Sequence, residues 1–212
     1  MDPIAIIDYG MGNLRSVQKG LERVGAAAQV TRDAAVIAGA PGVVLPGVGA
    51  FGACMDNLRA YGLVDVVRHV IGRGTPFLGI CLGMQLLFEE SEEFGPVRGL
   101  GVFPGRVVRF GDRPHLQVPH MGWNQIRKQQ DVPHLQGIDD GAFVYFVHSY
   151  YVVPADPSLT ATSTEYGGEF TSAIARDNVF ATQYHPEKSQ AVGLRILENF
   201  GRVVKGESRV TR

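Results

Sequence analysis

The chain has 212 residues, of which 45% are hydrophobic and 19% are charged. A chain of this length buries roughly 70% of the surface that it exposes when unfolded, so it needs no cross-links to form a core. Its 20 basic and 21 acidic residues leave a net charge of −1, which provides no basic surface for nucleic acid or an anionic membrane. Two cysteines are too few for a disulfide scaffold, and we expect neither a metal site nor a cofactor.

The N-terminal residues show no basic segment and no cleavage site of a secretory signal. Near the middle of the chain, the longest strongly apolar stretch covers residues 142–147, far fewer than the ~20 residues needed to cross a bilayer. We therefore expect a cytoplasmic protein.

The first hundred residues predict strands that alternate with helices. Short apolar runs indicate buried strands, and apolar residues at helical spacing indicate the helices between them. The expected strands cover residues 4–7, 43–45 and 76–80, and the expected helices cover 14–24, 55–71 with a break near Gly62, and 83–90. This alternation is typical of a parallel sheet with helices on both faces.

The pattern changes from about residue 100, where strand-like segments follow one another with turn signals between them. These segments cover residues 102–110, 143–147 and three pieces within 160–184, and a last helix carries Val192, Ile196, Leu197 and Phe200. We predict one α/β domain over residues 1–204, followed by a polar tail over 205–212. Its sheet is expected to be open, mostly parallel and doubly wound, with helices on both faces and added antiparallel strands.

Gly47, Gly49 and Gly52 match the G-x-G-x-x-G pattern of dinucleotide-binding loops and stand between a predicted strand and a predicted helix. That pattern also requires an acidic residue ~20 positions later to bind a ribose hydroxyl, and the segment 69–73 contains none. Glycines at such a turn also allow backbone N–H groups to stabilise an oxyanion. Nucleotide binding through loop 47–52 stays open as an alternative.

The segment Gly79-Ile80-Cys81-Leu82-Gly83 is the cysteine counterpart of the G-x-S-x-G nucleophile elbow. Small neighbours permit a strained turn that presents the nucleophile at the carboxyl edge of the sheet, and the positive end of the next helix favours the thiolate. The N–H of Leu82 then points toward the oxyanion of a tetrahedral intermediate. From the elbow alone, a buried structural cysteine is an equally good interpretation, and it is the one that we adopt for Cys54.

A thiolate nucleophile needs a base and a group that orients the base. Of the six histidines, His185 alone directly follows a predicted strand and precedes a carboxylate, Glu187, by two residues. Cys81 and His185 then share the carboxyl edge of the sheet, where ligands of open α/β sheets bind. The other histidines are His69, in a helical pattern, His120 and His148, which stay open as residues that line the site, and His115 and His134.

The strings GICLGMQ at residues 79–85 and YHPEKS at 184–189 resemble those of class I, triad-type glutamine amidotransferases. Further strings resemble the glutaminase subunit of imidazole glycerol phosphate synthase, from histidine biosynthesis. They are IIDYGMGNLRSV at 6–17, LPGVGAFG at 45–52, PHMGWN at 119–124 and FVHSYYV at 146–152. The resemblance covers nearly the whole chain, and no catalytic position departs from it.

The resemblance implies that a Cys-His-Glu triad hydrolyses glutamine to glutamate and ammonia. Cys81 would attack the side-chain amide, His185 would protonate the leaving ammonia, and Glu187 would orient His185. Backbone N–H groups of Val48 and Leu82 would form the oxyanion hole. The residues that the family pattern places around bound glutamine are Gly47, Gly49, Gln85, Glu93, Ser149 and Tyr150. Without the resemblance, Glu93 would be assigned to a solvated acidic run.

The resemblance also implies a partner in a heterodimer, a (β/α)8-barrel cyclase. The cyclase would use the ammonia to make imidazole glycerol phosphate and an aminoimidazole carboxamide ribonucleotide. Ammonia released into bulk water would be protonated and lost by diffusion, so the glutaminase site should face the cyclase. The residues that we expect at this interface are Asn13, Trp123, Tyr145 and Lys188.

The residues alone leave a third function open, a stand-alone thiol hydrolase with the same triad. Full activity without a partner would distinguish such an enzyme from a synthase subunit. Saturable binding of a nicotinamide nucleotide would instead support the dinucleotide-binding alternative.

Overall fold

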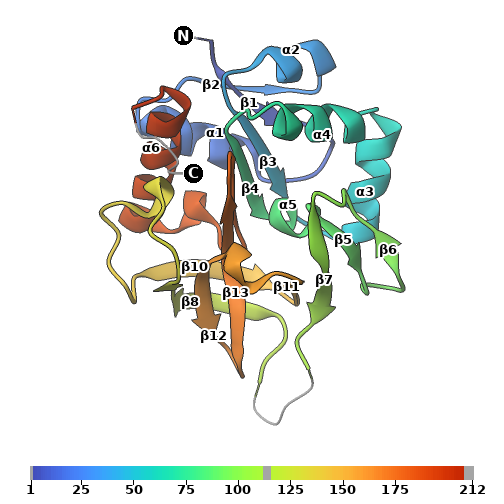
Figure 1. Ribbon diagram of the computed structural model, residues 1–212, viewed down its shortest axis with the longest axis vertical. Coiled ribbons are helices and arrows are strands. Elements are labelled where there is room, and N and C mark those ends of the chain that lie inside the picture. The colour runs from blue at the N-terminus through green and yellow to red at the C-terminus, as the bar shows by residue number, and fades with distance from the viewer. Residues whose placement is uncertain (1, 112–115, 208–212) are drawn as a thin grey trace.

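The computed structural model describes residues 2–111 and 116–207 (Figure 1). His115 and the last five residues of the expected tail therefore lie outside the described residues. Within the described part of the chain, no helix is long and apolar enough to cross a membrane.

Five parallel strands form the central part of the sheet. In spatial order they are β2 (Ala28–Thr31), β1 (Ile4–Ile7), β3 (Val43–Gly47), β4 (Phe77–Cys81) and β14 (Val179–Thr182). Every residue of β1, β3, β4 and β14 is buried, as expected for strands that are covered on both faces.

Helices cover both faces of these strands and enclose two separate hydrophobic cores (Figure 1). The helices on one face are α1 (Leu14–Arg23) and α6 (Gln190–Val204), and those on the other are α2 (Ala34–Gly39), α3 (Phe51–Ala60) and α4 (Val64–Gly72). Gly25 follows α1 with φ +77°, a conformation that glycine adopts without steric cost. The predicted doubly wound α/β architecture is confirmed.

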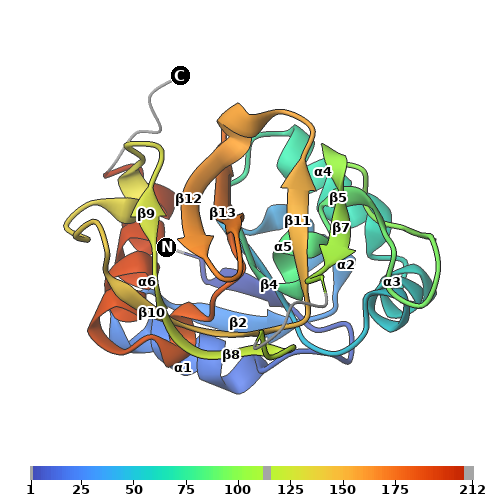
Figure 2. The ribbon, with the colours of Figure 1, turned by 90° about the horizontal axis from the view of Figure 1, so that it is seen from below.

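Antiparallel strands extend the sheet beyond β14, as predicted from the second half of the chain (Figure 2). In spatial order they are β13 (Glu169–Arg176), β11 (Tyr150–Pro154), β7 (Phe103–Arg109), β5 (Phe88–Ser91) and β6 (Val97–Arg98), with β12 (Thr160–Glu165) and β9 (Arg127–Lys128) as a branch from β13. Only the pair β5–β7 within this region is parallel among the described residues.

A separate two-stranded ribbon, β8 (His120–Gln125) with β10 (Phe143–His148), lies below the carboxyl ends of the central strands (Figures 1 and 2). Short helical turns complete the fold: α5 (Leu82–Gln85), η1 (Pro133–Leu135), η2 (Pro157–Leu159) and η3 (Pro186–Lys188).

The predicted helix over residues 83–90 is wrong. Helix α5 ends at Gln85, and Phe88 already belongs to β5, which pairs with β7 and β6. Residues 82–88 are all buried, so they form an apolar run without the one-sided period that separates a surface helix from a strand. Residues 88–91 form a strand because they pair with β7, a partner that the local sequence pattern does not reveal.

Strand β3 also differs from its prediction because it continues through Pro46 to Gly47. Proline has no N–H for a neighbouring strand, but β1 pairs with β3 only as far as Val44. Pro46 therefore lies where β3 has a neighbour on one side only, β4. The prediction also missed helix α2 and the strands β2, β6, β8, β9 and β11.

Candidate active site

Cys81 is the last residue of β4 and adopts φ +55° and ψ −112°, a strained conformation for a residue other than glycine. Its small neighbours make this turn sterically feasible. A Cβ atom at Gly83 would overlap the carbonyl oxygen of Leu45, and one at Gly79 would lie 2.9 Å from Cβ of Ala181. The strained elbow predicted from the glycine spacing is therefore present.

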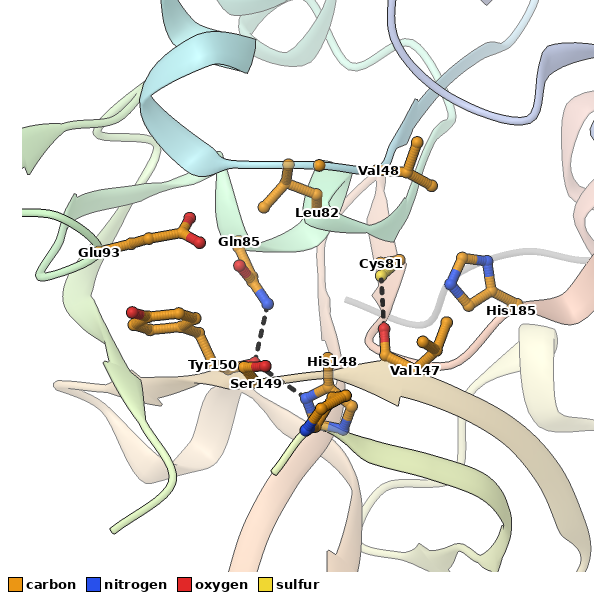
Figure 3. A pocket seen from close by; sticks show the side chains of 12 residues that line it. Val48, Cys81, Leu82, Gln85, Glu93, Val147, His148, Ser149, Tyr150 and His185 are labelled. Atoms are coloured by element: carbon orange, nitrogen blue, oxygen red, sulfur yellow. Dashed lines mark hydrogen bonds between the residues drawn. The ribbon is translucent and has the colours of Figure 1, made fainter. Parts of the chain in front are cut away.

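His185 and Glu187 form a buried pair beside this elbow. Nδ1 of His185 lies 2.8 Å from Oε1 of Glu187, and the two side chains are only 2% and 1% exposed. A carboxylate can only accept, so Nδ1 carries the proton and the ring is held with Nε2 free of hydrogen bonds to the described residues. Figure 3 shows this ring directed toward Cys81.

The electrostatics of the pair favour a cationic imidazole. Burial alone would lower the pKa of His185, but the negative charge of a Cys81 thiolate and the hydrogen-bonded Glu187 outweigh it and raise this pKa to about 10. We expected the following helix to favour the thiolate, but α5 has only four residues and a correspondingly small dipole. The imidazolium of His185, rather than a helix, is the principal positive charge facing the sulfur.

Cys54 has the opposite environment. It is fully buried in α3 and contacts the hydroxyl of Tyr9 and the carbonyl oxygen of Val48. Burial, together with the charge of Glu93, raises the pKa of this thiol to about 11. Cys54 therefore stays a protonated, structural thiol at neutral pH.

A cavity of about 270 Å³ lies beside Cys81 and gathers most of the predicted site residues (Figure 3). Its lining comes from the ends of β3 and β4, from α5 and from the connection between β10 and β11. The predicted residues that line it are Val48, Gly49, Cys81, Leu82, Gln85, Glu93, Ser149, Tyr150 and His185. Two predicted residues lie behind the lining: Glu187 contacts His185, and Gly47 packs so closely on Leu82 and Tyr9 that a Cβ atom would not fit.

Glu93 is tied to the start of α3. Its Oε2 accepts a hydrogen bond from the backbone N–H of Phe51 at 2.6 Å, and the N-cap residue Ala50 offers no side-chain cap. A dinucleotide would place its phosphate at this helix N-terminus. Because a carboxylate already occupies that position, the structure argues against nucleotide binding through loop 47–52.

A pair of buried histidines supports the floor of the cavity. His148 Nδ1 donates to the carbonyl oxygen of Tyr150 at 2.8 Å, so its Nε2 accepts from His120 Nδ1 at 2.9 Å. Burial lowers the pKa of His148 to about 3 and that of His120 to about 4, which keeps both rings neutral. The sequence left both residues open, and only the pairing of β8 with β10 brings them opposite each other.

Gln183 was missed by the sequence analysis. Its Nε2 lies 3.6 Å from Sγ of Cys81, and its Oε1 accepts from Gln85. Its position two residues before His185 could have indicated it, because alternate residues of an extended segment point to the same side.

Three of the four expected interface residues form a cluster. The rings of Trp123 and Tyr145 lie 6.0 Å apart, and Nζ of Lys188 lies 5.8 Å from the centre of the Tyr145 ring. The backbone carbonyl of Tyr145 accepts from the N–H of His185 at 3.0 Å, which connects this cluster to the buried pair. Asn13 stands at the N-cap of α1, and no described contact joins it to the other three.

Comparisons with known proteins identify the family of this chain. The family model described as glutamine amidotransferase class-I matches residues 5–203. The imidazole glycerol phosphate synthase subunit HisH of Syntrophotalea carbinolica is 63% identical over 203 residues, which cover 93% of this chain and 98% of that protein. The subunit HisH of Geobacter sulfurreducens is 57% identical over 206 residues, which cover 95% and 99% of the two chains.

A solved structure described as a glutamine amidotransferase matches the fold with a TM-score of 0.73 at 19% sequence identity, covering 96% of this chain and 99% of that one. The chain therefore belongs to the class I glutamine amidotransferases and, within them, to the HisH subunits of imidazole glycerol phosphate synthase.

Proposed function

We propose that this chain is the glutaminase subunit of an imidazole glycerol phosphate synthase. It would hydrolyse glutamine to glutamate and ammonia and deliver the ammonia to a separate cyclase subunit. The observation that carries the proposal is Cys81, held at a strained strand end and facing the buried pair His185–Glu187 across a cavity of amino-acid size.

The proposed reaction starts when the Cys81 thiolate attacks the side-chain amide carbon of glutamine. Negative charge develops on the amide oxygen and is stabilised by the backbone N–H groups of Leu82 and Val48. His185 Nε2 gives its proton to the departing nitrogen, which leaves as ammonia, and a γ-glutamyl thioester remains. His185 then takes a proton from water, the resulting hydroxide attacks the thioester, and the thiolate leaves as glutamate forms.

The cavity offers groups for the two ends of the substrate. Glu93 supplies a carboxylate for the α-ammonium group, while its bond to Phe51 holds it in position. Ser149 and Tyr150 line the same cavity, with Tyr150 on the side of Glu93 (Figure 3). Val48 and Gly49 also line the cavity, and Gly47 is packed behind them.

We also propose that the chain pairs with a (β/α)8-barrel cyclase in a heterodimer, in the cytoplasm. Its relatives are called subunits, which supports an assembly. The exposed ring of Trp123 and the neighbouring Tyr145 and Lys188 lie beside the backbone of His185 and offer an aromatic and cationic surface for docking. Asn13 completes the set of proposed interface residues.

Glutamate release tests this function directly. We expect release by the wild-type chain in the presence of the purified cyclase and its nucleotide ligand, and none by Cys81→Ala. The same complex of Cys81→Ala should still make its product from added ammonia, because only the ammonia source is lost. Glutamate release by Cys81→Ala would move the nucleophile to another residue.

The second cysteine provides a matched control. A glutamine analogue that alkylates the nucleophile should add one adduct to Cys54→Ala and none to Cys81→Ala, as read by mass spectrometry. Labelling of Cys54 instead would contradict the assignment.

A further inference from the structure

The sulfur of Cys81 has a buried neighbour that the proposed reaction does not use. Gln183 directly follows β14 and is completely buried, and its backbone N–H donates to the backbone carbonyl oxygen of Ser172 in β13 at 2.8 Å. Its side-chain Nε2 lies 3.6 Å from Cys81 Sγ, although Gln183 does not line the cavity. Gln183 therefore approaches the nucleophile from within the protein, on the side away from substrate.

A backbone carbonyl determines which end of this amide faces the sulfur. The carbonyl oxygen of Tyr150 can only accept, and Gln85 Nε2 lies 2.9 Å from it, so this end of Gln85 is the amino group (Figure 3). The same amino group donates to Gln183 Oε1 at 2.9 Å. Because its oxygen faces Gln85, Gln183 must turn its own amino group toward Cys81.

The two partners of the sulfur respond differently to loss of its proton. The carbonyl oxygen of Val147, 4.0 Å away, can interact favourably only with a thiol that donates. The amino group of Gln183 can donate to the sulfur in either state, and hydrogen bonds to a charged acceptor are about twice as strong as those between neutral groups. Deprotonation thus weakens the contact with Val147 and strengthens the contact with Gln183.

We propose that Gln183 is a positioning residue for the nucleophile: its amide, oriented by Gln85 and the Tyr150 carbonyl, stabilises the Cys81 thiolate and directs it toward His185. Gln85 acts through Gln183 in this arrangement, in addition to lining the cavity. The inference deepens the proposed glutaminase function and rests on it.

The test uses the full-length chain and the variant Gln183→Met, which keeps a side chain of similar length but removes the donor. Iodoacetamide alkylation of Cys81 is followed across pH by mass spectrometry of the peptide that contains it. We expect the pH of half-maximal alkylation to rise by about one unit, since hydrogen bonds to charged groups have that strength. The other titratable groups near Cys81 are unchanged in this variant: His148, His185, Glu93, Tyr150 and Glu187 around the cavity, and Tyr9 and Cys54 behind it.

A second variant and a control separate positioning from packing. Gln183→Asn keeps an amide in the sheet but withdraws it by one methylene, so the same rise is expected if Gln183→Met does not fold. Asn199→Leu removes another buried amide. Among the described residues, that amide donates to the carbonyl oxygens of His134 and Gln136 and makes no contact with the sulfur. This control should lose stability and keep the wild-type alkylation profile.

Steady-state kinetics with the cyclase provide a second measurement. Because Gln183 does not line the cavity, kcat for glutamate release should fall about tenfold in Gln183→Met while KM for glutamine stays unchanged. Unchanged alkylation midpoints in both folded Gln183 variants would overturn the inference. A shifted midpoint in a chain that releases no glutamate with its partner would support the role of Gln183 and reject the glutaminase function.

Discussion

Gly79 and Gly83 stand on either side of Cys81 and have no side chains, so neighbouring backbone can pack closely against this turn. At Gly83 a methyl group would overlap the carbonyl oxygen of Leu45 in the neighbouring strand, and that strand cannot withdraw because it also pairs with β1. The constraint is steric, and it acts on the one turn that gives Cys81 its positive φ.

Replacing Gly83 therefore tests the elbow. We expect Gly83→Ala to lower the free energy of unfolding by about 3 kcal/mol or more, because Leu45 and α5 must separate. Gly72→Ala is the matched control: Gly72 ends α4 with open space around it, so this change should be neutral or stabilise by about 0.5 kcal/mol. Urea unfolding measures both, and equal stability of the two variants would show that the elbow tolerates a side chain.

His134 makes the stability of the fold sensitive to acid. Burial lowers its pKa to about 4, whereas an unfolded histidine titrates near 6.5, so between these values the unfolded chain binds more protons. Stability must therefore fall as the pH drops through this window, by about 3 kcal/mol for this residue alone. His134→Phe preserves the ring stacked on Phe180 but cannot titrate, so its unfolding free energy should fall less between pH 7 and pH 4.5. Equal acid sensitivity of wild type and variant would contradict this assignment.

Each residue of the proposed triad has a local signature in the sequence. Cys81 stands between two glycines at a strand end, and His185 and Glu187 are joined through a proline. The supporting groups have no such signature. Gln85 and Gln183 are 98 positions apart, and His120 meets His148 only through strand pairing. Contacts of that kind depend on the tertiary fold, which local patterns do not contain.

The ribbon β8–β10 links the surface to the active site. Tyr145 presents its ring to Lys188 and Trp123 on one side, while its backbone bonds to His185 and to the hydroxyl of Ser189. A partner that binds the exposed side of this ribbon would therefore contact the strand that supports His185, the proposed catalytic base.

Lys188→Ala tests this element. We expect the affinity for the cyclase to fall about three- to tenfold and the stimulation of glutaminase to fall with it, because a cation beside an aromatic ring is lost at the proposed interface. Lys205→Ala, beyond the opposite end of α6, is the control and should change neither quantity. Titration of labelled cyclase measures the affinity. If Lys188→Ala matches the wild type in both measurements, Lys188 lies outside the interface.

Sequence patterns predicted the central elements well because buried parallel strands produce apolar runs and surface helices produce a regular apolar stripe. They failed around residues 82–88, where burial on all sides removes the helical period. They also failed for β8. Its apolar residues Met121 and Trp123 are exposed, so the apolar side chains of this strand lie on its outer face. Apolar side chains on the exposed face of a strand obscure the alternation by which a strand is recognised.

At the scale of the whole molecule, a glutaminase that supplies another enzyme should not hydrolyse glutamine when that enzyme is absent. We expect the isolated chain to release glutamate slowly, and release to rise severalfold or more when the cyclase and its nucleotide ligand are added. Coupled assay of glutamate over a titration of cyclase measures the change, with Cys81→Ala as the blank. High turnover by the isolated chain would favour a stand-alone hydrolase.

The domain division is also a property of the whole chain. Helix α6 ends at Val204, the last residue of the predicted domain. The extent of a single domain over residues 1–204, with a tail over 205–212, stays a prediction. Limited proteolysis that removes the tail without loss of partner-dependent activity would support it.

The bond between Glu93 and the start of α3 couples two equilibria, the binding of glutamine and the conformation of residues 47–49. Residues 47–49 are joined to that helix through its N-cap residue Ala50, and the same carboxylate is proposed to bind the substrate ammonium. If the cyclase changes the conformational equilibrium of this loop, the change in free energy is shared with glutamine binding. Linkage then requires reciprocity: whatever factor the partner applies to glutamine affinity, glutamine must apply to partner affinity.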